Sequence, residues 1–143
     1  MPTLPWTRAQ SSAPASGAAV VVLGSQLRLR SYRHTFGFVR AAMRVRKQVQ
    51  DAPGALGVSL IAQPLRRTYW TLSAWIDQES MDRFVAARPH LDVMRKYHDR
   101  IDGAWFTTWE RAESELPKPN TNAKALWTEA KDRLAGAHSK GRP

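Results

Sequence analysis

The hydrophobic period of this chain changes twice from about two residues to about 3.6, and this constrains the fold more than any other feature. Residues 19–30 and 68–76 are rich in β-branched and aromatic side chains, which is typical of strands. Each run is followed by apolar side chains at helical spacing, in residues 34–50 and 77–85. Two strand–helix units in one short chain predict an α+β domain.

The remaining segments complete the order β-α-β-β-α-β. Residues 56–63 and 104–110 predict the second and fourth strands, and residues 90–98 predict a further helical piece after Pro89. Asp77 is placed to cap the helix that follows it, with Met81, Phe84 and Val85 as its buried stripe. This order predicts a ferredoxin-like four-stranded antiparallel sheet with both helices on one face.

The chain divides into three parts. Residues 1–18 are rich in Pro, Ala and Ser and predict a flexible arm, residues 19–112 form the folded domain, and residues 113–143 hold a linker, a C-terminal helix and a basic tail. Leu126, Ala130 and Leu134 mark the apolar face of that helix, and we expect Gly136 to end it.

Both faces of the third and fourth strands carry large apolar groups. Trp70, Leu72 and Ile76 alternate with Tyr69 and Trp75 in the third strand. A sheet face left bare with such side chains would be an unusually large exposed patch for a monomer. Pairing two sheets face to face would bury it, so the sequence predicts a homodimer, which gel filtration would test.

Composition and charge limit the kinds of partner and compartment that we expect for this chain. The chain has 143 residues, a net charge of +10 and no cysteine, which excludes disulfides and thiolate sites. Its cations are dispersed along the chain and no nucleic-acid-binding motif is present, so we do not expect a nucleic-acid partner. No run approaches the ~20 apolar residues of a membrane span. The first residues do not form a secretion signal, so we expect a cytoplasmic protein.

Two stretches resemble a known family. WTLSAWIDQESMDRFV followed by PHLDVMRKY, together with APGALGVSL, resembles the antibiotic-biosynthesis-monooxygenase-like group of the dimeric α+β barrel superfamily. The likeness covers about residues 19–110. It implies a homodimer with a ligand pocket between sheet and helices in each subunit, and its members include cofactor-independent oxygenases of aromatic phenols and haem-degrading oxygenases. A shared fold does not decide between these activities.

The haem-degrading branch can be tested by position. Its characteristic Trp and haem-ligating His correspond to Phe84 and Met94 here, and its strand-one Asn falls near Ser25. The sequence therefore disfavours haem degradation, while haem binding through His90 or His98 stays open as an alternative. The four histidines show no spacing typical of a metal site, and no metal is expected.

His90 and Trp75 are the catalytic candidates. An imidazole can take a proton from a phenol, and an indole N–H can orient a ligand oxygen. The alternative is structural: a histidine at a helix start bonded to backbone or solvent, and a tryptophan that fills the strand–helix junction. The candidate ligand-binding residues share the face of Trp75 or lie on the following helices: Tyr69, Thr71, Ser73, Phe84, Met94 and Tyr97.

These observations predict a small dimeric barrel protein that binds a flat aromatic or apolar molecule. As an enzyme it would be a cofactor-independent monooxygenase acting on a phenol or quinol. The alternatives are a haem-binding barrel and a non-catalytic binding or stress-associated module.

Overall fold

The computed structural model describes residues 3–8 and 19–140, and the side chains of Thr3, Arg8 and residues 138–140 are outside the description. The strands are β1 (Thr3–Arg8), β2 (Ala19–Leu29), β3 (Ala55–Gln63), β4 (Thr68–Trp75) and β5 (Ile101–Ala112). The helices are α1 (Thr35–Asp51), α2 (Gln78–Ala86), α3 (His90–Tyr97) and α4 (Lys124–Lys140). Within the described ranges, no helix combines the length and apolarity needed to cross a membrane.

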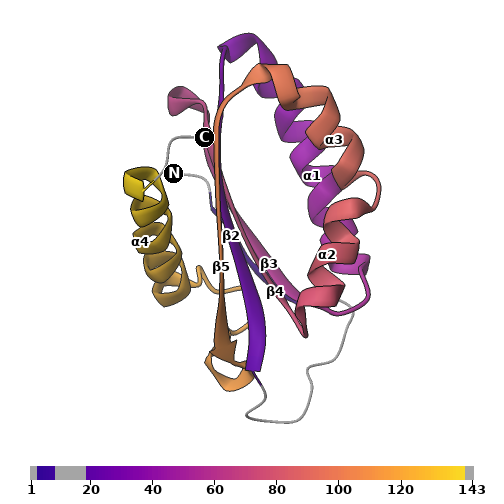
Figure 1. The fold of residues 1–143 in the computed structure, drawn as a ribbon, viewed down its shortest axis with the longest axis vertical. Helices are drawn as coiled ribbons and strands as arrows, with labels where there is room; N and C mark the ends of the chain where they lie inside the picture. Colours follow the sequence, from indigo (N-terminus) through magenta and orange to yellow (C-terminus); the bar gives the residue numbers. More distant parts are fainter. Residues whose placement is uncertain (1–2, 9–18, 141–143) are drawn as a thin grey trace.

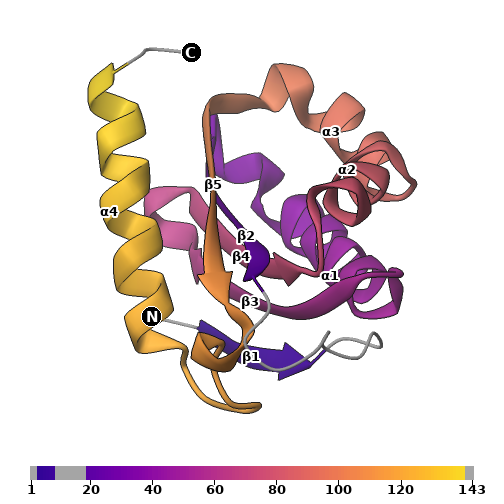
Figure 2. The ribbon, with the colours of Figure 1, turned by 60° about the horizontal axis from the view of Figure 1, so that its bottom comes forward.

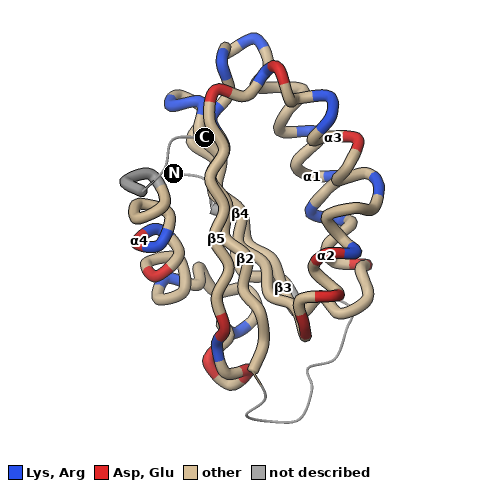
Figure 3. Tube along the Cα trace, in the orientation of Figure 1, with Lys and Arg blue, Asp and Glu red and all other residues tan. Residues whose placement is uncertain are grey.

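The strands form one antiparallel sheet in the order β1-β3-β4-β2-β5. Without β1, this is the expected ferredoxin-like order, so the α+β prediction is confirmed. Helices α1, α2 and α3 lie on one face of the sheet and α4 lies on the other (Figure 1). We call these the inner and outer faces. Charged residues lie mainly on the helices and at the two ends of the sheet, and the middle of the sheet carries almost none (Figure 3).

The start of α2 follows the predicted cap, but its buried stripe differs by one position. The Asp77 carboxylate accepts a hydrogen bond from the Ser80 backbone N–H at 2.8 Å. Phe84 is buried as expected, whereas Val85 is 40% exposed. Ser80 is buried in its place, because it packs directly against the backbone of Gly54, where a Cβ would collide with it. A small side chain at the contact lets α2 lie close to the loop before β3.

The outer face of the sheet is covered by the chain itself, which changes the argument for a dimer. Trp109 on β5 and Leu72 on β4 are buried in one cluster with Leu126, Trp127 and Ala130 of α4. Gly136 lies within this helix and does not end it. The sequence argument required a bare sheet face; since α4 covers that face, the homodimer stays a prediction supported only by the family resemblance.

A strand was missed at the N-terminus. Residues 3–8, expected as part of a flexible arm, form β1 at the edge of the sheet beside β3 (Figure 2). Trp6 is buried against Gly57, and its backbone N–H and C=O pair with Thr121 and Asn120, at 2.7 Å each. The linker before α4 therefore supplies a bonding partner on the free side of β1. The arm expected at residues 9–18 lies outside the described residues.

Candidate functional site

The buried side chains of the inner face form two separate clusters. One lies at the end of the sheet near Phe38, Tyr69 and Tyr97, and the other surrounds Trp75 and Phe84. Three hydroxyl residues occupy the sheet between them: Ser25 on β2, and Thr71 and Ser73 on β4. We call these three residues the hydroxyl belt. Polar groups in the middle of an otherwise apolar layer are costly unless hydrogen-bonded, so the belt is a feature that packing alone does not require.

The hydroxyls of the belt form their hydrogen bonds with neighbouring residues of β2 and β4. The Ser25 and Thr71 hydroxyls form a short hydrogen bond with each other across β2 and β4. The Ser73 hydroxyl accepts from the indole Nε1 of Trp75 at 2.9 Å. Each hydroxyl oxygen has further bonding capacity beyond these contacts, because a hydroxyl can donate once and accept twice. The belt can therefore bind a ligand oxygen without first losing its own partners.

Solvent reaches this part of the inner face. Three residues of the inner face are only partly buried, although they lie on strands with a neighbour on each side. They are Thr71 on β4, Leu60 on β3 and Leu23 on β2. On β5, the register places Phe106 and Thr108 on the inner face beside β2, and both are exposed, Phe106 by 51%. The helical layer thus leaves the inner face open toward β5.

Trp75 and His90, the two catalytic candidates, are joined through Phe84. The ring of Phe84 lies 5.0 Å from the Trp75 ring and 4.9 Å from the His90 ring, measured between centroids. Trp75 is fully buried, and its indole Nε1, the only polar atom of its side chain, donates to the Ser73 hydroxyl. Among the described residues, no ring contact joins Trp75 directly to His90, and Phe84 lies between them.

His90 is held at the start of α3 by two hydrogen bonds. Its backbone N–H donates to the Gln48 side chain at 2.7 Å, and its ring Nδ1 lies 2.9 Å from the Val85 carbonyl. A bond to a carbonyl assigns the proton to Nδ1 and leaves Nε2 as an acceptor. Burial lowers the pKa of His90, partly opposed by the Val85 carbonyl. His90 is therefore a neutral imidazole with one basic nitrogen at neutral pH.

Tyr69 and Tyr97 belong to the other cluster. Phe38 of α1 contacts both rings, at 4.9 Å and 5.2 Å between centroids. Burial raises the pKa of the Tyr69 phenol, with the Thr35 hydroxyl opposing that shift. These two tyrosines lie at one end of the inner face, and Trp75 lies on the opposite side of the hydroxyl belt. The candidate residues predicted from the sequence therefore lie on both sides of the belt and do not converge on one point.

The two remaining candidates, Met94 and His98, lie on α3 and directly after it. Met94 is partly buried on α3, and His98 is exposed at the end of that helix, in the short helical turn His98–Arg100. An exposed side chain does not fit an axial haem ligand, which needs an enclosing apolar pocket. Among the described residues, no group of three potential metal ligands is clustered.

Two contributors to the belt region were not predicted. The sequence indicates Ser25 only as the position where haem-degrading relatives have an asparagine, and it gives no signal for Phe106. The alternation of β2 places Ser25 on the inner face, but only the register with Thr71 and Phe106 reveals its role. That register depends on contacts between strands far apart in the sequence.

Comparison with known proteins addresses the fold. No family model matches the chain, and no curated protein matches it. Among solved structures, SnoaB, a cofactor-independent oxygenase from Streptomyces nogalater, has a TM-score of 0.55 at 16% identity, over 71% of this chain and all of that one. A candidate antibiotic biosynthesis monooxygenase from Deinococcus radiodurans has a TM-score of 0.58 at 13% identity, over 65% of this chain and 93% of that one.

A longer protein also matches. A candidate monooxygenase from Fusobacterium nucleatum has a TM-score of 0.62 at 10% identity, over 78% of this chain and 52% of that one. This chain therefore spans about half of that protein. The chain has the fold of the antibiotic-biosynthesis-monooxygenase-like proteins. The resemblance seen in the sequence is confirmed at the level of the fold.

Proposed function

We propose that the protein binds a flat aromatic molecule between the inner sheet face and α1–α3, and oxygenates it without a cofactor. The observation that carries this proposal is the hydroxyl belt between two apolar clusters, which solvent reaches at Thr71. Small-molecule sites combine a mostly apolar lining with a few polar groups that fix orientation. The belt supplies the polar groups and the flanking aromatic rings supply the lining.

The reaction class follows from what such a lining can do. A phenol or an anthrone-type substrate that loses a proton becomes electron-rich enough to reduce O₂ by itself. In the anthrone case a CH₂ group becomes C=O, and the second oxygen atom leaves as water, so the substrate supplies all the electrons. The protein must remove a proton and hold the resulting anion. The likeness to SnoaB supports this choice of class.

The belt and His90 have separate roles in this proposal. Thr71 and Ser73 donate to the substrate oxygen and stabilise its anionic form. His90 provides a neutral imidazole with a free Nε2, but Phe84 intervenes between it and Trp75. As the proton acceptor, His90 must therefore act at the Phe84 end of the site.

Ligand binding tests the proposal through the belt. Thr71→Val with Ser73→Ala removes two hydroxyls, and we expect anthrone or quinol affinity to fall about tenfold, since each lost hydrogen bond costs about 0.5–1.5 kcal/mol. Thr107→Val is the matched control, because Thr107 lies on the outer face beside Gly24. Quenching of tryptophan fluorescence measures binding, and an oxygen electrode measures turnover. Equal affinity in both variants would contradict the proposed site.

The same measurements address the alternatives. Binding without oxygen uptake would indicate a non-catalytic binding module. A Soret band on haem addition that His90→Ala abolishes would indicate a haem protein, and retention of that band in His98→Ala would assign the ligand to His90.

A further inference from the structure

A concave surface lies on the side of the helical layer that faces away from the sheet. It is a groove of about 630 Å³ between α1 and α2 that extends to the segment joining α2 to α3. Small-molecule sites occupy roughly 300–1,000 Å³. The groove therefore has the size of a ligand site, and it is separate from the hydroxyl belt on the inner face.

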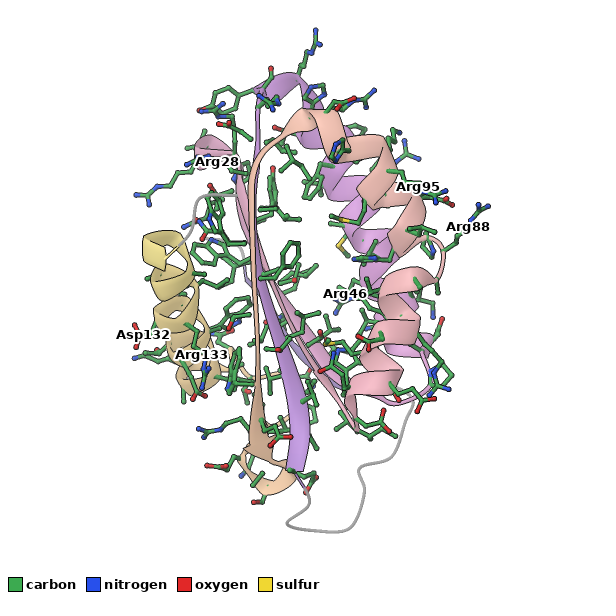
Figure 4. All side chains as sticks on the ribbon, viewed as in Figure 1. Arg28, Arg46, Arg88, Arg95, Asp132 and Arg133 are labelled. Atoms are coloured by element: carbon green, nitrogen blue, oxygen red, sulfur yellow. The ribbon has the colours of Figure 1, made fainter. Side chains whose placement is uncertain are left out.

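The floor and the rim of the groove differ in character. Phe84, Ala52 and Ala87 line it with apolar atoms, together with two prolines. Five charged side chains also line it, and four of them are cations: Arg44, Lys47, Arg83 and Arg88, against Asp51. The lining thus has a net charge of +3 from these groups. Arg88 lies on the face of the helical layer that points away from the sheet (Figure 4).

Arg44 differs from the other three cations of the lining, each of which is held in an exposed ion pair. Lys47 pairs with Asp51 at 3.4 Å, Arg83 with Glu79 at 3.5 Å, and Arg88 with Asp92 at 3.4 Å, each along its own helix or helix start. Arg44 makes no ion pair within residues 3–8 and 19–140. An unpaired guanidinium beside an apolar floor is suited to a carboxylate or a sulfonate, which it can bind through two parallel hydrogen bonds.

Hydrogen bonds also link the two walls of the groove. Gln48 lies in its wall, where its side-chain Nε2 donates to the Phe84 carbonyl at 3.2 Å and its Oε1 accepts from the His90 backbone at 2.7 Å. One amide thus ties α1 to both ends of the α2–α3 connection. Such a preformed wall lowers the conformational cost of binding a ligand.

We infer that this groove binds a small amphipathic anion, with an apolar or aromatic body on Phe84 and a carboxylate or sulfonate on Arg44. The two parts of the ligand match the two parts of the lining. This site does not depend on the function proposed for the inner face.

Two dyes that differ only in charge test the inference. Anilinonaphthalene sulfonate carries an aromatic body and an anion, and N-phenylnaphthylamine has the same rings without the charge. We expect Arg44→Gln to weaken binding of the sulfonate about fivefold, the effect of losing one solvent-exposed ion pair, and to leave the neutral dye unchanged. Arg40→Gln is the matched control, because Arg40 is exposed one turn earlier on α1 and does not line the groove.

A second pair of variants tests the location. Ala87→Trp fills the groove and should abolish binding of both dyes, whereas Ala86→Trp, exposed and outside the lining, should not. Circular dichroism confirms that the variants are folded. Equal losses in Arg44→Gln and Arg40→Gln would assign the effect to general surface charge and overturn the inference. So would binding that survives Ala87→Trp but is lost in Thr71→Val, which would place the dyes on the inner face.

Discussion

At the scale of single residues, Phe84 and His90 connect the sheet to the helical layer. Phe84 contacts the ring of Trp75 on one strand and the ring of His90 on the next helix. His90 in turn is bonded to Gln48 and Val85, which belong to two different helices. Because His90 lies at this junction, its pKa is lowered by burial and not by a charged neighbour.

His90→Gln should change how stability depends on pH. The folded protein lowers the pKa of His90 below the ordinary value of 6.5. Protonation therefore favours the unfolded state, and stability falls as pH drops from about 6.5 through the lower folded pKa. We expect His90→Gln to show a smaller decline between about pH 7 and pH 5 in urea unfolding, and to keep the part due to His34, whose pKa is also lowered.

His98→Gln provides the comparison, because His98 is exposed at the end of α3. It should keep the decline of the unmodified protein. The interpretation fails if His90→Gln and the unmodified protein lose the same free energy of unfolding over this interval.

At the scale of elements, substitution by alanine should have opposite effects on stability at two glycines. Gly57 on β3 allows Trp6 of β1 to pack on the sheet, where a Cβ would overlap the indole. We expect Gly57→Ala to destabilise the protein by about 1–3 kcal/mol, as overpacking does. Gly136→Ala, inside α4 with no heavy atom within 4 Å of its added Cβ, should stabilise it by up to about 1 kcal/mol. Denaturant unfolding measures both.

Faster hydrogen exchange at Leu60 and Ile61 on β3, which pair with β1, would show that the destabilisation of Gly57→Ala begins at this strand. If both alanine variants are equally stable, the contact of Gly57 with Trp6 does not hold β1 in place.

Elements with a clear hydrophobic period could be predicted from the sequence. Residues 19–30 and 68–76 form strands β2 and β4 almost as expected, and Asp77 caps α2 through Ser80. β1 was missed because Pro5 within it and Pro2 just before it weaken the strand signal, and because the strand is held by the packing of Trp6 on Gly57, which is far away in the sequence.

The site was predictable only in part. Alternation along one strand correctly grouped Tyr69, Thr71, Ser73 and Trp75 on one face. The pairing of Ser25 with Thr71, and the position of Phe84 between Trp75 and His90, depend on tertiary contacts. The charged groove also combines α1 with α2, whose relative packing no local pattern specifies.

At the scale of the whole molecule, α4 takes the place that a second sheet would occupy in a face-to-face dimer. Trp127 of α4 reaches across the outer face, where its Nε1 donates to the Ser59 hydroxyl at 3.0 Å, and that hydroxyl donates to the Leu4 carbonyl of β1 at 2.8 Å. The periodicity of Leu126, Ala130 and Leu134 could not show this, because the same apolar face could equally cover a partner's sheet. The two arrangements differ only in whether α4 belongs to the same chain as the sheet that it covers.

A disulfide distinguishes them. A Cβ built on Gly24 of β2 lies 3.5 Å from the Cβ of Ala130 on α4, close to the spacing of about 3.8 Å found in disulfides. The chain has no cysteine of its own, so Gly24→Cys with Ala130→Cys introduces a single defined pair. If α4 covers the sheet of its own chain, oxidation gives an intramolecular bond and a monomer on a non-reducing gel. Each single variant keeps a free thiol and controls for random coupling. A reducible dimer band formed by the double variant, and by neither single variant, would mean that α4 is exchanged between two copies, and that the predicted homodimer assembles through this helix.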